Sequence, residues 1–271
     1  MINKKYLKNL RSKEINNKND FIFDLYNERI IDSLEIINLN FKEILIIGDH
    51  GIKLREFINQ KYINASFTMY DLEKNNFDID EWNHESNKKK YDLIVSNFFL
   101  FLSDKFDNIL KKIIFSLAPN GFFIATLPAE DNFKTLKLAM IKTDVEFYSG
   151  AFNRFNNFIE LTKIIDLLKK NDFKIPLVNF EKINLEYNKF EKLLHDIRSM
   201  NLSYYHKDKK QIFENKFYFK KLEKNFKKNS NNNFSISTNF YIISGWKDHK
   251  SQQKPLKPGE AKNKLKDFYN Y

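Results

Sequence analysis

Two glycines stand where a short apolar run gives way to a helical pattern, in a chain that has only six glycines among 271 residues. Gly48 and Gly51 follow Glu43–Ile47, a β-branched run typical of a buried parallel strand. A glycine there lets the backbone approach a ligand, because no Cβ intrudes, and the next helix adds free N–H groups. This turn, with Asp49, predicts a loop that holds the amino-acid part of a cofactor. An ordinary strand-to-helix turn would show the same spacing.

Polar residues also end the next two apolar runs. Asp71 follows the run 65–70, and an acidic residue at the end of a second strand can accept hydrogen bonds from both hydroxyls of a ribose. Ser96 and Asn97 end the run that begins at Tyr91, where a substrate would meet the cofactor. A helix cap or a solvated turn is the alternative role for Asp71. Ligands of open α/β sheets bind at the carboxyl ends of the strands, so these residues form one candidate site.

The elements that must position these residues alternate between strand and helix. Apolar runs bounded by turn residues, and apolar residues at helical spacing, predict a doubly wound, mainly parallel sheet with an antiparallel pair of late strands at its edge. Residues 118–121, which include Pro119 and Gly121, predict a tight turn. We expect strands at 43–47, 65–70, 91–96, 122–127, 177–187 and 236–246, helices at 20–39, 52–59, 105–117, 155–171 and 190–200, and a helical stretch at 207–228.

The same patterns predict three parts of the chain. Residues 1–40 form an N-terminal helical segment, and 41–246 form the main domain, with a helical insertion at about 188–230. Residues 247–271 are polar and contain two prolines, which predicts an extended or disordered tail. We expect this tail, from Ser251 to Gly259, to lie across the domain surface or to become ordered on a partner.

Composition narrows the class of protein. Hydrophobic residues make up 42% of the chain, enough for a core, yet none of their runs reaches the about 18 residues of a transmembrane helix. The polar first residues do not predict a secretory signal. The absence of cysteine excludes disulfides and thiolate metal sites, and it fits a cytoplasmic protein. The five histidines lack metal-site spacing, so no metal is expected. The formal charge of +11 is spread along the chain and does not by itself favour nucleic acid.

The order of these motifs resembles the class I S-adenosylmethionine-dependent methyltransferases. The glycine turn, the acid after the second strand and the Tyr-Asp-Leu-Ile-Val-Ser strand carry that likeness. The second half is similar to bacterial relatives of a mitochondrial complex I assembly factor, an arginine hydroxylase. The likeness runs from about Phe21 to the end and is strongest in the segments 158–173, 193–200 and 245–259. It implies S-adenosyl-L-methionine as cofactor, bound by Gly48, Asp49, Gly51, Asp71 and Ser96.

The resemblance also implies a substrate and a partner. The branch modifies an arginine of an iron–sulfur subunit of complex I, so Asn97 and Arg154 become candidate substrate contacts. Arginine gives bidentate recognition that lysine cannot, although an ion pair within the fold would equally explain Arg154. Methyl transfer and hydroxylation both remain open.

Departures from the family pattern support a rival hypothesis. Ile46 stands where the superfamily carries an acidic residue, and Phe101 and Leu102 stand where relatives carry a His-Trp pair. The stretch from Asp71 to Tyr91 is short for a complete helix and strand, so one element of the sheet is expected to be reduced or missing. The rival is a non-catalytic complex I assembly factor that has lost its cofactor.

Overall fold

The structure is a computed structural model, and it describes residues 3, 21–48, 52–71, 78–82, 89–200, 202, 204–207, 209 and 214–252. Its centre is a six-stranded sheet with the order β2-β1-β3-β4-β6-β5. The strands are β1 (Glu43–Ile47), β2 (Ser66–Tyr70), β3 (Tyr91–Asn97), β4 (Leu117–Pro128), β5 (Lys174–Tyr187) and β6 (Phe234–Trp246).

The first four strands form the parallel part of the sheet. β1 pairs in parallel with β2 and with β3, and β3 pairs in parallel with β4. β6 then runs antiparallel to both β4 and β5. The prediction of a mainly parallel, Rossmann-like sheet with an antiparallel edge is therefore confirmed. Because four strands point the same way, their carboxyl ends share one edge of the sheet.

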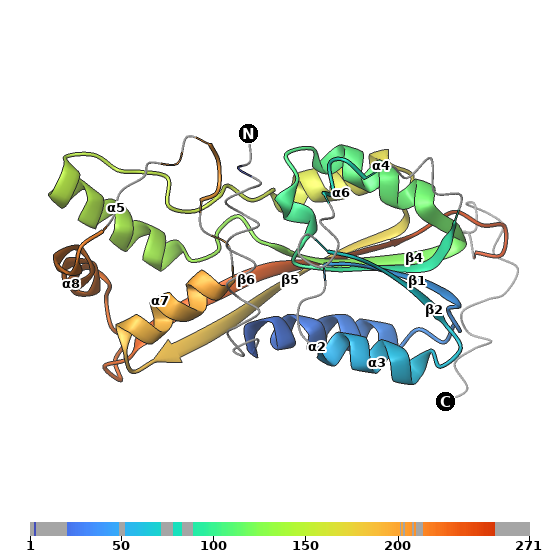
Figure 1. Ribbon diagram of the computed structural model, residues 1–271, viewed down its shortest axis with the longest axis horizontal. Helices are drawn as coiled ribbons and strands as arrows, with labels where there is room; N and C mark the ends of the chain where they lie inside the picture. Colours follow the sequence, from blue (N-terminus) through green and yellow to red (C-terminus); the bar gives the residue numbers. More distant parts are fainter. Residues whose placement is uncertain are drawn as a thin grey trace, which may run out of the picture.

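Helices cover both faces of the sheet (Figure 1). On one face lie α4 (Phe106–Ser116) and α6 (Leu161–Lys170), and on the other lie α2 (Phe21–Glu35) and α3 (Lys53–Lys61). The helices α5 (Lys134–Tyr148), α7 (Phe190–Ser199) and α8 (Lys216–Asn225) gather at one end, at the left of Figure 1. A single 3₁₀ turn, η1 (Leu100–Leu102), follows β3.

Aromatic side chains fill the core on the α2 face, as the abundance of Phe predicts. Tyr26 of α2 is fully buried and stacks on Phe98, with ring centroids 4.3 Å apart. Phe240 of β6 contacts the same tyrosine at 4.4 Å. This contact fixes α2 over the junction of the parallel and antiparallel parts of the sheet.

Two expectations about local structure were wrong, and one helix was missed. Residues 118–121 are not a turn between elements, because β4 already pairs at Leu117 and resumes at Phe122 opposite Leu93. Pro119, and Asn120 at φ 61°, lie in an irregular part of the strand. Here β4 has more residues than the stretch of β3 that it faces. The helix expected at 155–171 begins only at Leu161. Helix α5 was not predicted, because its apolar residues do not keep to one face.

The expected shortening of the sheet agrees with the described residues. Between β2 and β3, the described residues 78–82 and 89–90 contain no helix or strand. The described part of the tail, 247–252, also has neither. The remainder of the tail prediction lies outside the described residues, and the three-part division of the chain stays a prediction. Within the described ranges, no helix combines the length and the apolar composition needed to cross a bilayer.

Candidate functional site

The carboxyl edge of the parallel strands gathers most of the residues expected to form a site. Gly48 follows β1, Asp71 follows β2, and Ser96 and Asn97 end β3. The backbone N–H of Gly48 donates to the carbonyl of Tyr70 at 2.8 Å, which brings the ends of the first two strands together. The predicted residues thus lie at one edge of the sheet, and their role as a cofactor site stays a prediction.

Gly48 occupies a backbone conformation that only glycine adopts readily. Its φ is +79°, in the left-handed region. A Cβ at this position would lie 2.5 Å from Cβ of Phe99 and 2.7 Å from Cδ2 of its ring. The glycine is therefore required by the fold, and the space beside its Cα is filled by a side chain of this protein.

Asp71 and Ser96 are both buried at this edge. Asp71 is 6% exposed, which is rare for a carboxylate. The hydroxyl of Ser96 is fully buried and donates to the carbonyl of Ile47 at 2.9 Å. Ser96 therefore ties the end of β1 to β3.

Asn97 belongs to a buried polar network that sequence reasoning did not find. Its Nδ2 donates to Oδ1 of Asn27 at 2.5 Å, and its Oδ1 accepts from Oγ1 of Thr126 at 2.6 Å. Thr126 in turn accepts from the N–H of Phe98 at 3.1 Å. All three polar side chains are fully buried. The available signal was Asn27, a polar residue on the apolar face of α2.

A cavity of about 560 Å³ opens beyond the ends of β3 and β4. Aromatic residues form much of its wall: the rings of Phe101 and Phe158 meet edge to face at 5.8 Å. The hydroxyl of Tyr205 donates to the carbonyl of Phe101 at 3.1 Å, and burial raises the pKa of Tyr205 above its usual range. The residues that line the cavity include Ser103, Asp104, Lys105, Leu127, Pro128, Asn156, Lys163 and His206.

Charges of both signs stand at the rim of this cavity. Asp107 accepts hydrogen bonds from Lys170 and from Asn171, each at 2.8 Å, and these hold its pKa well below the usual range. Asp104, Lys105 and Lys163 also line the cavity. Aromatic walls with a charged rim suit a long side chain that has an apolar stem and a polar end.

The segment from Phe98 to Phe101 connects this cavity with the glycine turn. Phe99 packs on Gly48, whereas Phe101 lines the cavity. Phe98 and Phe101 also contact each other, with ring centroids 5.8 Å apart. Phe98 itself has a φ of 48°, so this short segment turns sharply between the two places.

Arg154 lies in an ion-pair cluster and does not line this cavity. Its guanidinium contacts Oδ1 of Asp144 at 2.5 Å and Oε1 of Glu214 at 2.6 Å. The hydroxyl of Tyr218 donates to Asp144 at 2.7 Å, and the Asp144 side chain has no exposed surface. The cluster joins α5 to the approach of α8. The substrate role of Arg154 stays a prediction.

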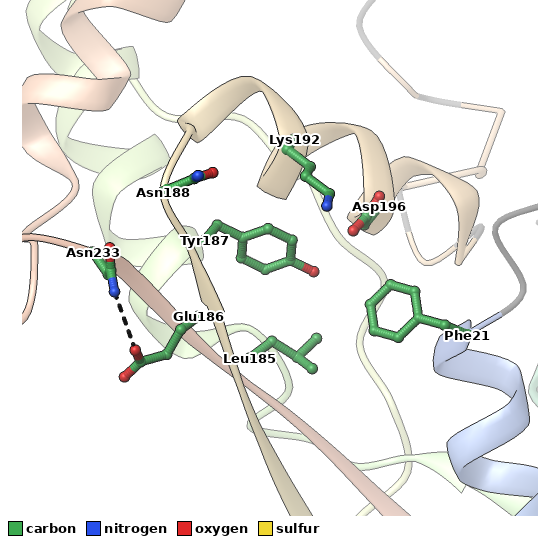
Figure 2. Close-up of a pocket in the computed structure, with 8 residues that line it drawn as sticks. All are labelled: Phe21, Leu185, Glu186, Tyr187, Asn188, Lys192, Asp196 and Asn233. Atoms are coloured by element: carbon green, nitrogen blue, oxygen red, sulfur yellow. Dashed lines mark hydrogen bonds between the residues drawn. The ribbon is translucent and has the colours of Figure 1, made fainter.

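A second cavity, of about 490 Å³, lies between the end of β5 and α7 (Figure 2). The ring of Tyr187 points into it toward Lys192 and Asp196, and Phe21 faces it from α2 (Figure 2). Burial, followed by the nearby Asp196, raises the pKa of Tyr187 above its usual range. On the far side, Asn233 donates to Glu186 at 3.3 Å. None of the residues expected to form the cofactor site lines this cavity.

Two of the expected cofactor contacts, Asp49 and Gly51, lie outside the described residues. The structure brings Gly48, Asp71 and Ser96 to one edge, where Asn97 is the last residue of β3. Among the described residues, no three His, Asp or Glu side chains gather as a metal site requires. What remains is a sheet edge with a buried carboxylate, a glycine turn and an adjoining cavity.

Comparison with known proteins adds relatives to this geometry. No protein-family model matches the sequence. The chain is 30% identical over 187 residues to the protein named arginine-hydroxylase NDUFAF5, mitochondrial, of Dictyostelium discoideum, which covers 65% of this chain and 41% of that protein. The human protein of the same name is 22% identical over 258 residues, covering 90% of this chain and 75% of that protein. This chain is thus similar in sequence to the NDUFAF5 proteins.

The likeness to NDUFAF5 confirms the resemblance stated from the sequence. The chain spans less than half of the Dictyostelium NDUFAF5 and three quarters of the human one. The names place those relatives in mitochondria, so a cytoplasmic location for this chain stays a prediction.

Solved structures with a similar arrangement are distant. One is a candidate methyltransferase from Bacillus halodurans, with a TM-score of 0.48 and 9% identity, covering 82% of this chain and 98% of that one. Another is the plantazolicin methyltransferase BpumL in complex with SAH, with a TM-score of 0.42 and 14% identity, covering 89% of this chain and 90% of that one.

Proposed function

We propose that this chain is a methyltransferase-like protein that binds S-adenosylmethionine, modifies a protein substrate and takes part in the assembly of respiratory complex I. The proposal joins the NDUFAF5 relationship to the chemistry of the carboxyl edge. An iron–sulfur subunit of complex I is the proposed substrate, as the family resemblance implies. The modification is either methyl transfer or hydroxylation of an arginine, the second being what the relatives' name describes.

The observation that carries the proposal is the pairing of Gly48 with the end of β2. The hydrogen bond from Gly48 to Tyr70 sets a buried carboxylate, Asp71, beside the glycine turn. A carboxylate at the end of the second strand fits the two hydroxyls of a ribose, since each can donate to one of its oxygens. Asp71 would orient the nucleoside of S-adenosylmethionine, and the Gly48 turn would face the amino-acid part of the cofactor.

The adjoining cavity supports a protein side chain as the substrate. Its aromatic walls, Phe101 and Phe158, offer surface for an aliphatic stem, and Asp104 offers a carboxylate for a cationic end. Bound S-adenosylmethionine would supply an electrophilic methyl group. The protein's part would be to hold the substrate close to that group and to exclude water.

A second function is favoured by a specific contact. The space that a Cβ would take at Gly48 is occupied by Phe99 and is not open to a ligand. Ile46, in place of the family's acidic residue, is buried in the core and offers no hydrogen bond to a cofactor. These two features fit a non-catalytic assembly factor that keeps the fold and binds a complex I subunit without S-adenosylmethionine.

Thermal unfolding separates the two functions. A ligand at a hundred times its dissociation constant stabilises the native state by about 2.7 kcal/mol, which raises the melting temperature of a chain this long by about 5 °C. We expect that shift with S-adenosylmethionine. The Asp71→Asn variant should lose most of it, because charge-assisted hydrogen bonds contribute about 1.5–3 kcal/mol.

The control for this measurement is Asp32→Asn, which removes a carboxylate whose side chain is 60% exposed on α2. This variant should keep the full shift. If Asp32→Asn and Asp71→Asn both respond like the unaltered chain, Asp71 does not contact the nucleoside. No shift in any of the three proteins at millimolar ligand would support the non-catalytic assembly factor.

A further inference from the structure

Strand β5 forms one edge of the sheet and is long for an edge strand. It runs over 14 residues, and β6 is the strand that pairs with it among the described residues. Large apolar side chains on it remain open to solvent: Leu177 is 52% exposed and Phe180 is 48% exposed. A long edge strand with exposed apolar residues is a template for pairing with another strand.

The two faces of β5 differ in what they offer. Leu177 and Ile183 belong to one face, since side chains two or more even steps apart share a side of a strand. Ile183 packs against the core on the α2 face. Phe180 belongs to the opposite face, where its ring contacts Tyr241 at 5.9 Å. A strand added to this edge would therefore cover apolar surface on both faces.

The sequence of β5 is complementary to itself in one antiparallel register. Two identical antiparallel strands related by a twofold axis must place one residue opposite its own copy. With Phe180 on the axis, Leu177 faces Ile183 of the second copy, and Phe180 faces Phe180. No like charges stand opposite each other in this register, because Glu181 faces Asn179 and Lys182 faces Val178.

Neighbouring registers are disfavoured by charge. An axis at Glu181 would place two carboxylates opposite each other, and an axis at Lys182 would place two ammonium groups opposite each other. Like charges that face each other across a strand pair are destabilising. Moving the axis to Asn179 or to Ile183 would set Glu181 against a leucine, Leu177 or Leu185. The register centred on Phe180 avoids all of these pairings.

The start of β5 limits how far such pairing extends. Pro176 has no N–H to donate, and the register with β6 shifts between Lys174 and Leu177. Proline and bulges are features that end pairing at sheet edges. The remaining stretch, from Leu177 onward, is regular and has the length of an ordinary strand pair.

We propose that two copies of this chain associate through their β5 edges, antiparallel, with Phe180 on the twofold axis. The two sheets then continue into each other, and the exposed apolar residues of both edges become buried. The carboxyl ends of the parallel strands stay outside this contact, since β6 lies between β5 and β4, the nearest parallel strand.

A register-specific disulfide tests this contact, because the chain contains no cysteine of its own. Directly opposite residues in an antiparallel pair have Cβ atoms about 4.5–5.5 Å apart, close to the distance for a disulfide. Under mild oxidation, Phe180→Cys should form a covalent dimer. In this register the two copies of residue 182 are offset by four residues, about 13 Å along the strands, so Lys182→Cys should stay uncrosslinked.

The mass in solution gives an independent test. We expect light scattering to report twice the 32.6 kDa of one chain at tens of micromolar protein. Phe180→Lys should halve this mass, because two ammonium groups would then face each other. Leu138→Lys, at a 59% exposed position of α5, should leave the dimer intact. Thermal melting establishes that each variant is folded.

Each opposite outcome overturns the proposal. A mass of one chain for the unaltered protein would exclude the dimer and leave the edge to a strand of another protein. A dimer that survives Phe180→Lys would lie on a different surface. Crosslinking of Lys182→Cys as fast as Phe180→Cys would indicate either another register or random collision.

Discussion

Replacing Gly48 with valine is expected to destabilise the protein by about 2–6 kcal/mol, a large part of the 5–15 kcal/mol typical of a folded domain. Two effects add. A branched residue at φ +79° is strained by about 1–3 kcal/mol, and forcing atoms against the ring of Phe99 costs about 1–3 kcal/mol more. Urea denaturation measures the loss as a lower midpoint. Gly48→Ala should lose much of the same stability, because its Cβ meets the same atoms.

The matched control is Gly150→Ala. At Gly150 the nearest heavy atom to an added Cβ is 4.0 Å away, which is ordinary contact. That variant should unfold within about 1 kcal/mol of the unaltered chain. If Gly48→Val instead unfolds normally but fails to bind S-adenosylmethionine, the space beside Gly48 belongs to a ligand and Phe99 can leave it.

Replacing Arg154 with alanine is expected to cost about 3 kcal/mol, since removing one partner of a buried ion pair leaves the other charge uncompensated. The charge left behind is Asp144, whose side chain is fully buried, with Glu214 close by at 10% exposed. Hydrogen bonds to Asp144 from Tyr218 and from the N–H of Phe152 keep the loss near the lower end of the about 3–5 kcal/mol typical of such a change.

Two further variants identify the cause of that loss. Adding Asp144→Asn to Arg154→Ala should recover part of the stability, because the stranded charge is then gone. Arg29→Ala removes an exposed pair with Asp32 and should cost less than about 1 kcal/mol. If Arg154→Ala melts normally and loses only activity, Arg154 contacts the substrate, as the family resemblance implied.

Much of the fold was predictable because its signals are local. The β-branched run of β1 and the alternating residues of β5 and β6 each carry a strand signal within a few residues. Parallel pairing then brings the residues at the ends of β1, β2 and β3, namely Gly48, Asp71 and Ser96, to one edge of the sheet. Helix α5 was missed because its apolar residues lie on more than one face: Leu136 and Ala139 are buried, whereas Leu138, Ile141 and Val145 are exposed.

The contacts that define the site were not predictable in the same way. The bonds of Asn97 to Asn27 and Thr126 join residues 70 and 29 positions away in the chain. The packing of Phe99 on Gly48 likewise depends on how β3 ends, a detail that the residue pattern does not specify. The sequence was compatible with two roles for Arg154, a substrate contact or an ion pair within the fold. Only the positions of Asp144 and Glu214 in the structure reveal its ion pairs.

The most direct test of the proposed function is calorimetric titration of the full chain with S-adenosylmethionine. We predict a saturable binding heat with one ligand per chain, reduced at least tenfold in affinity by Asp71→Asn and unchanged by Asp32→Asn. The absence of any binding heat at millimolar ligand, from protein that melts cooperatively, would contradict cofactor binding and leave the non-catalytic assembly factor as the function of this fold.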